Sequence, residues 1–161
     1  MKLHQPYIFP ITVQFEDVDA YGVVHHPNYL KYLERARSHG IKQVGYSLGK
    51  FSSSGFAVAI SEIHANYLRP ALMEQELFVI SLVTAIGKSS VKLYQSITAC
   101  SPKLEELERV ENDIFKLSET IFRAEIKLIC VDSNSFRTKS IPLDLKQSIT
   151  FANYETNLGS M

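Results

Sequence analysis

One stretch of the chain contains the change of pattern that decides the fold: Glu16-Asp17-Val18-Asp19-Ala20-Tyr21-Gly22-Val23-Val24-His25-His26-Pro27-Asn28-Tyr29-Leu30. Its first part, with two aspartates, a glycine and two adjacent histidines, is typical of a turn. Pro27 suits the first turn of a helix. Small and apolar residues then recur at spacings of four, three, four and four, at Tyr29, Leu33, Ala36, Gly40 and Val44. We therefore predict an amphipathic helix from Pro27, with stops at Gly45 and Gly49.

The sequence on both sides of this helix is typical of strands. An alternating run over 8–15 precedes the turn, and the uninterrupted apolar run Phe56 to Ile60 predicts a strand covered on both faces. Further strands are expected over 77–86, 91–100 and 120–131, the first two joined by the turn Gly87-Lys88-Ser89-Ser90, with a last strand ending near Phe151. In the 120–131 strand one face carries Phe122, Ala124, Ile126, Leu128 and Cys130. This order predicts an α+β fold, an antiparallel sheet of about five or six strands wrapped around one long helix.

The segment Pro102 to Ser118 does not have a strand pattern. Its apolar residues Leu104, Leu107, Val110, Ile114 and Leu117 have helical spacing among charged residues. We expect a helical insertion at 102–118 whose apolar stripe packs on its own sheet, with binding to a partner as the alternative.

Composition limits the classes of function. The chain has 161 residues, the size of one domain, and its 17 basic residues balance 17 acidic ones. No uniform field is available to hold nucleic acid or an anionic membrane by charge alone. Met1 to Pro10 does not have the pattern of a signal peptide, and no window approaches a membrane span of ~20 apolar residues. We expect a cytoplasmic protein with neither a nucleic-acid partner nor membrane insertion.

The two cysteines and five histidines do not have the spacing of a metal or redox motif. Cys100 and Cys130 lie in separate strand-like runs, so we expect two core thiols. A disulfide between them is the lesser alternative, because a reducing cytosol disfavours it. We expect neither a metal nor a cofactor.

The motifs together resemble those of a known family, the 4-hydroxybenzoyl-CoA thioesterase-like branch of the hotdog thioesterases. The resemblance is carried by the 16–30 run, Leu33-Glu34-Arg35-Ala36-Arg37, Tyr67-Leu68-Arg69-Pro70-Ala71, Gly87-Lys88-Ser89-Ser90 and Lys139-Ser140-Ile141-Pro142. Within the branch, the sequence is most similar to the bacterial Tol-Pal-associated acyl-CoA thioesterases. The resemblance implies the hotdog fold, hydrolysis of an acyl-CoA thioester, and a homodimer that assembles into a homotetramer.

The resemblance also implies roles for individual residues. Asp19 matches the catalytic aspartate, acting as nucleophile or general base, and His26 matches an assisting position. Without the motif, Asp19 would be read as a turn or helix cap, and His26 as a structural histidine. Asp17 is read as structural, and His25 is left outside the site.

Five further residues are expected at the substrate: Tyr21, Val24, Lys88, Ser89 and Ser90. Tyr21 stands where close relatives often have glycine, which would narrow the pocket beside Asp19. Lys88, Ser89 and Ser90 match a turn that meets the coenzyme A portion, although a Gly-Lys-Ser turn is also common in solvated hairpins. Two other functions stay open for a hotdog domain: hydration or dehydration of acyl-CoA or acyl carrier protein thioesters, and non-catalytic binding of acyl thioesters.

Overall fold

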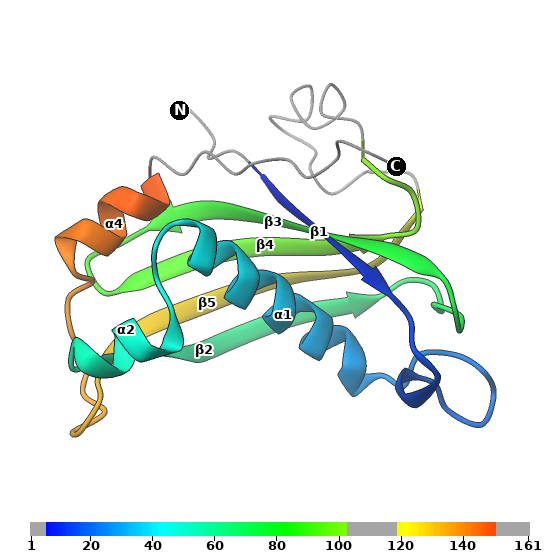
Figure 1. The fold of residues 1–161 in the computed structure, drawn as a ribbon, viewed down its shortest axis with the longest axis horizontal. Helices are drawn as coiled ribbons and strands as arrows, with labels where there is room; N and C mark the ends of the chain where they lie inside the picture. The colour runs from blue at the N-terminus through cyan, green and yellow to red at the C-terminus, as the bar shows by residue number, and fades with distance from the viewer. Residues whose placement is uncertain (1–5, 103–118, 151–161) are drawn as a thin grey trace.

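The computed structural model describes residues 6–102 and 119–150 (Figure 1). In chain order the elements are β1 (Tyr7–Thr12), the 3-10 turn η1 (Phe15–Asp17), α1 (Pro27–Gln43), α2 (Leu48–Ser53), β2 (Phe56–Tyr67), β3 (Glu76–Ile86), β4 (Ser90–Thr98), β5 (Thr120–Asp132) and α4 (Leu143–Thr150). The five strands form one antiparallel sheet in the order β1-β3-β4-β5-β2. The expected α+β architecture of the hotdog fold, a sheet around one long helix, is confirmed.

Helix α1 packs on one face of the sheet, called here the inner face (Figure 1). It begins at Pro27 as predicted, and Tyr29, Leu33, Ala36 and Gly40 are buried on the predicted stripe. The approach is close, because a Cβ at Gly40 would lie 3.0 Å from Cδ1 of Tyr7. Gly45, with φ +88°, follows the end of the helix, where a left-handed residue is favourable. Gly49 lies inside α2, so its predicted role as a stop was wrong.

The predicted hairpin and the long strand are confirmed. Strands β3 and β4 pair in antiparallel register on either side of the 87–89 turn. In β5, Phe122, Ala124, Ile126 and Cys130 are buried in the core and Leu128 packs against it. No helix in the described part of the chain is both long enough and apolar enough to cross a bilayer.

Two strand predictions were wrong. After the 132–135 turn, the described residues 143–150 form α4 and not the predicted strand, because Leu145 and Ile149, four residues apart, are both buried in the core. The 56–60 run is not covered on both sides, because β2 is an edge strand whose Val58 and Ile60 are 43% and 47% exposed. The sequence pattern identified the apolar residues correctly, but it did not show which elements pack against them.

Two further expectations concern single segments. Cys130 is a buried thiol as predicted, but Cys100 is exposed just beyond the end of β4, and the two form no disulfide with each other. The predicted insertion at 102–118 lies, except for Pro102, outside the described residues.

A polar cluster crosses the contact between α1 and the sheet. Gln95, fully buried on β4, accepts a hydrogen bond from Arg37 Nη1 at 2.7 Å. Its amide nitrogen donates to the Leu33 carbonyl at 3.2 Å and to Ser81 Oγ at 2.7 Å. Burial lowers the pKa of the Arg37 guanidinium, which remains a cation. Gln95 therefore supplies both the acceptor for a half-buried charge and a donor for the helix backbone.

Replacing Gln95 by leucine should lower the free energy of unfolding by about 1–3 kcal/mol, because the Arg37 cation loses its acceptor inside the core. Urea unfolding followed by circular dichroism measures the change. Ser96→Ala is the matched control on the same strand: the Ser96 hydroxyl is buried with no hydrogen-bond partner among the described residues, so its loss should cost little. Equal effects in the two variants would contradict the importance of the Arg37–Gln95 contact.

Candidate functional site

The loop between β1 and α1 is anchored by Asp17. This residue is only 5% exposed, and its carbonyl accepts the His25 amide and Asn28 Nδ2, both at 2.9 Å. Its carboxylate accepts the Gln14 amide at 2.9 Å. Burial raises the pKa of the neighbouring Tyr32 hydroxyl, and the Asp17 carboxylate raises it further. The backbone and one carboxylate oxygen of Asp17 thus hold the loop, which agrees with the structural role predicted for this residue.

Asp19 lies in the tight turn that this loop encloses. Its amide donates to the Val23 carbonyl at 2.9 Å and its carbonyl accepts the Gly22 amide at 3.0 Å, with Gly22 at φ +77°. One carboxylate oxygen, Oδ1, accepts the Tyr21 amide at 2.8 Å, the Asx-turn pattern. The other oxygen, Oδ2, has no donor among the described residues. Asp19 therefore does cap its turn, yet this half-buried carboxylate keeps one oxygen available.

His26 is placed at the N-cap of α1, and its backbone amide is free. The amide of His25 is used by Asp17, Pro27 has none, and the amide of Asn28 donates to the His25 carbonyl at 2.9 Å. The His26 amide has no acceptor in the described ranges 6–102 and 119–150, and the His26 side chain makes no capping hydrogen bond. A free amide at the positive end of a helix is suited to a developing oxyanion.

Aromatic residues hold the start of α1 against the sheet, a feature that the sequence reasoning missed. Tyr29 stacks on Phe122 with ring centroids 5.3 Å apart, and Tyr67 meets both rings edge-on. The Tyr29 hydroxyl accepts the Ala71 amide and the Tyr67 hydroxyl donates to the His26 carbonyl, both at 3.0 Å. Burial raises the pKa of Tyr29, the hydrogen bond with the Ala71 amide partly offsets this increase, and the negative charges of Tyr67 and Asp19 add to it. The 67–71 motif was the available signal for these contacts.

The remaining predicted residues fall into two groups. Tyr21 follows Asp19 and is 90% exposed, whereas Val24 is buried in the core, with its amide bonded to the Ala71 carbonyl. Lys88, Ser89 and Ser90 form the β3–β4 turn at the opposite end of the sheet from Asp19 (Figure 1). The length of β3 separates the two ends by roughly 30 Å. Within one chain, the structure does not bring these two groups together.

Basic residues gather at the Lys88 end. The Ile141 amide donates to the Lys88 carbonyl at 2.9 Å, which brings the 137–141 segment alongside the turn. This segment carries Arg137 and Lys139, both exposed. By contrast, the exposed glutamates Glu16, Glu74 and Glu76 lie at the Asp19 end, where the Glu74 amide bonds the Val13 carbonyl. Each end also carries charge of the opposite sign, since Asp132 pairs with Lys139 at 3.8 Å and Arg69 is exposed beyond β2.

The comparison with known families agrees with this geometry. A family model described as thioesterase-like superfamily matches residues 13–149, which include the Asp19 loop, α1 and all strands after β1. The chain belongs to the thioesterase-like superfamily.

Thioesterase-like relatives match along most of the chain. A Helicobacter pylori protein named acyl-CoA thioesterase YbgC is 34% identical over 137 residues, covering 84% of this chain and 93% of that protein. The Escherichia coli O157:H7 acyl-CoA thioester hydrolase YbgC is 25% identical over 134 residues, covering 83% and 88%. A solved structure, a 1,4-dihydroxy-2-naphthoyl-CoA thioesterase from Synechocystis, shares the fold with a TM-score of 0.75 at 17% identity, covering 93% and 99%.

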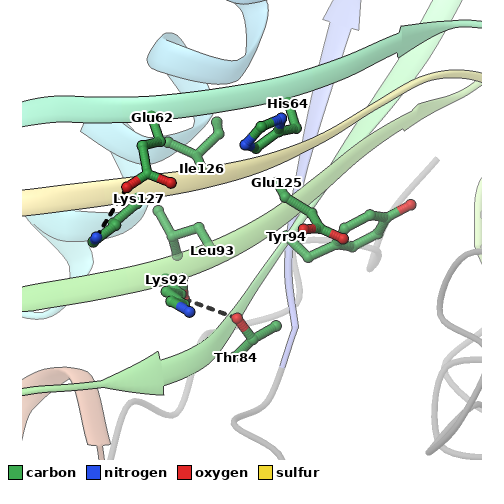
Figure 2. Close-up of a pocket in the computed structure, with 9 residues that line it drawn as sticks. All are labelled: Glu62, His64, Thr84, Lys92, Leu93, Tyr94, Glu125, Ile126 and Lys127. Carbon is green, nitrogen blue, oxygen red and sulfur yellow. Dashed lines mark hydrogen bonds and ion pairs between the residues drawn. The ribbon is translucent and has the colours of Figure 1, made fainter.

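A hollow elsewhere on this thioesterase-like domain is separate from the Asp19 loop. It has a volume of about 400 Å³ and is lined by Glu62, His64, Thr84, Lys92, Leu93, Tyr94, Glu125, Ile126 and Lys127 (Figure 2). Side chains alternate along a strand, so Tyr94 and Lys92 point away from the α1 side to which Gln95 points. The hollow therefore lies on the outer face of the sheet. In the described part of the chain, no group of three or more acidic, histidine or cysteine side chains could hold a metal ion.

Proposed function

We propose that this chain hydrolyses acyl-CoA thioesters to a carboxylic acid and free coenzyme A at a site built on Asp19 and the first turn of α1. One observation carries the proposal: a carboxylate with a free oxygen and an amide with no acceptor lie in one loop at the start of a helix. The thioesterase-like family and the names of the YbgC relatives support the same chemistry.

The residues divide the reaction between them. Asp19 Oδ2 either attacks the thioester carbon or removes a proton from the water that attacks it. The free amide of His26 donates to the oxygen on which negative charge develops. The carbon–sulfur bond then breaks, the thiolate takes up a proton as coenzyme A, and water supplies the hydroxyl group of the acid. The His26 imidazole, exposed beside this amide, assists by orienting water or substrate. We propose that no metal or cofactor takes part, because a thioester is already electrophilic.

The active unit that we propose is a homodimer joined along β2. Of the two edge strands, β1 has six residues and includes Pro10, which cannot donate to a ladder, whereas β2 has twelve. The exposed Val58 and Ile60 face the inner side of β2, where a second chain would cover them. Antiparallel pairing about a two-fold axis sets the Phe56 end of one β2 beside the Tyr67 end of the other. The basic turn of the partner would then adjoin Asp19.

This arrangement gives coenzyme A a place. The acyl thioester would lie at the Asp19 loop of one chain and the phosphates at Lys88, Ser89 and Ser90 of the partner, where Arg137 and Lys139 add positive charge. Tyr21 and Val24 would lie on the acyl side. Two such dimers would form the homotetramer that the resemblance implies. Two cysteines that are not joined by a disulfide agree with the cytoplasmic location that we propose.

Asp19→Asn should lower the turnover of acyl-CoA at least ~100-fold with little change in stability, since it keeps the shape and removes the carboxylate. The measurement is thiol release from a panel of acyl-CoA substrates. Tight binding without thiol release by the wild type would favour a non-catalytic binder and contradict the proposal. His26→Ala should cause a smaller loss, because the backbone amide remains.

Lys88→Ala should raise KM for coenzyme A thioesters by about three- to tenfold, and less at high salt, because the lost contact is ionic. The KM of a short thioester that lacks the phosphates should not change. Lys92→Ala is the matched control, an exposed lysine of the same hairpin that lies on the outer face of the sheet. Equal losses on both kinds of substrate would contradict the assigned role.

Ile60→Lys should convert the dimer to folded monomers and abolish turnover, because it places a charge on the inner side of the β2 seam. Sedimentation velocity measures the oligomeric state and thiol release measures turnover, both under the same conditions. Sedimentation of the wild type shows whether it is a dimer or a tetramer. Thr12→Lys, exposed on the other edge strand, should change neither. A fully active monomer would show that one chain suffices.

A further inference from the structure

The hydroxyl of Tyr67 makes a contact at the start of α1 that the hydrolytic scheme above does not use. Tyr67 is the last residue of β2, on the seam side of the inner face, and its ring is 51% exposed. Its orientation is nevertheless fixed, because it meets Phe122 at 4.9 Å and 71° and Tyr29 at 5.5 Å and 89° between ring centroids. Such edge-on contacts leave the ring little freedom. The hydroxyl is held in one place by the sheet.

This hydroxyl is bonded to the residue that carries the free amide. Its 3.0 Å hydrogen bond to the His26 carbonyl is the only side-chain hydrogen bond that His26 makes within residues 6–102 and 119–150. The His26 backbone is already helical, at φ −50° and ψ −36°, and its own side chain does not cap α1. Pro27, the next residue, has no backbone N–H and cannot donate a hydrogen bond that would hold the start of α1. The Tyr67 hydroxyl therefore restrains the His26 carbonyl directly, and it restrains the His26 amide through the φ and ψ angles of that residue. The Asn28 amide holds the other side of the amide's peptide plane, because it donates to the His25 carbonyl at 2.9 Å.

We propose that Tyr67 is a positioning residue for thioester hydrolysis: by holding the His26 carbonyl, it limits movement of the His26 backbone and so keeps the His26 amide in place for the oxyanion. The inference rests on the proposed function. Its chemical basis is that an oxyanion donor lowers the barrier only when it is oriented in advance, so a small misplacement costs rate and not substrate affinity. Because the tyrosine comes from the edge strand, it also ties the amide to the seam between subunits.

Tyr67→Phe is the direct test, since it keeps the ring contacts and removes only the hydroxyl. We expect kcat to fall about five- to tenfold, with KM for acyl-CoA, melting temperature and oligomeric state unchanged. Tyr46→Phe is the matched control: its hydroxyl ties the other end of α1 by donating to Asp144, so it should alter stability and leave kcat unchanged. A general loosening of α1 would lower kcat in both variants and overturn the proposal.

The double variant Tyr67→Phe with His26→Ala identifies the route. His26→Ala keeps the backbone amide, so the two losses in kcat should multiply if Tyr67 acts through that amide. A Tyr67 effect that disappears in the His26→Ala background would mean that Tyr67 orients the imidazole, which overturns the proposal.

The remaining outcomes are also decisive. A raised KM with unchanged kcat would make Tyr67 a substrate contact, and a lowered melting temperature alone would make it structural; either result overturns the inference. If the wild type hydrolyses acyl-CoA and Asp19→Asn does not, but Tyr67→Phe has the same kcat as the wild type, only this inference fails. If the wild type releases no thiol, the proposed function itself fails.

Discussion

Helix α1 can lie close to the sheet because small residues face it. Ala36 is fully buried, and the Tyr7 ring occupies the space that a side chain at position 40 would need. This packing sets the distance between α1 and the sheet. The hydrogen bond from Arg37 to the buried Gln95 also links the two elements. The first turn of α1 consequently has a fixed position, and Asp17 holds the preceding loop to it. The geometry of Asp19 and of the His26 amide follows from this close approach.

Asp17 and Asp19 are two residues apart, yet their environments give them different tasks. Asp17 is buried, and both its carbonyl and its carboxylate are engaged with the loop and the start of α1. Asp19 is on the outer side of the turn, where one oxygen satisfies the Tyr21 amide and the other is left over. Asp17 is shielded from solvent, whereas Asp19 is half-buried. Solvent access, not residue type, distinguishes them.

Much of this was predictable from local patterns. The helix face from Tyr29 to Gly40, the β3–β4 hairpin and the inner face of β5 follow directly from periodicity. The errors arose where the pattern does not say what lies opposite: the exposed inner side of β2 resembles a covered strand, and Leu145 and Ile149 suit either kind of element over a short run. For the site, the motif indicated Asp19 and His26, but the Tyr67 hydroxyl bond joins residues 41 positions apart, and no local pattern predicts it.

The separation of the two ends of the sheet bears on how a chain of zero net charge would bind a polyanion such as the proposed substrate. The Lys88 turn and Arg137 lie at one end, where Asp132 pairs with Lys139, and Asp19 and exposed glutamates lie at the other, where Arg69 is also exposed. In one chain, the Lys88 turn and the Asp19 loop are too far apart to contact the same thioester group and its neighbouring atoms together. In the antiparallel pairing along β2 that we propose, the two ends would meet across the subunit boundary. The edge strand β2 would then set the distance between Asp19 of one chain and the Lys88 turn of the partner.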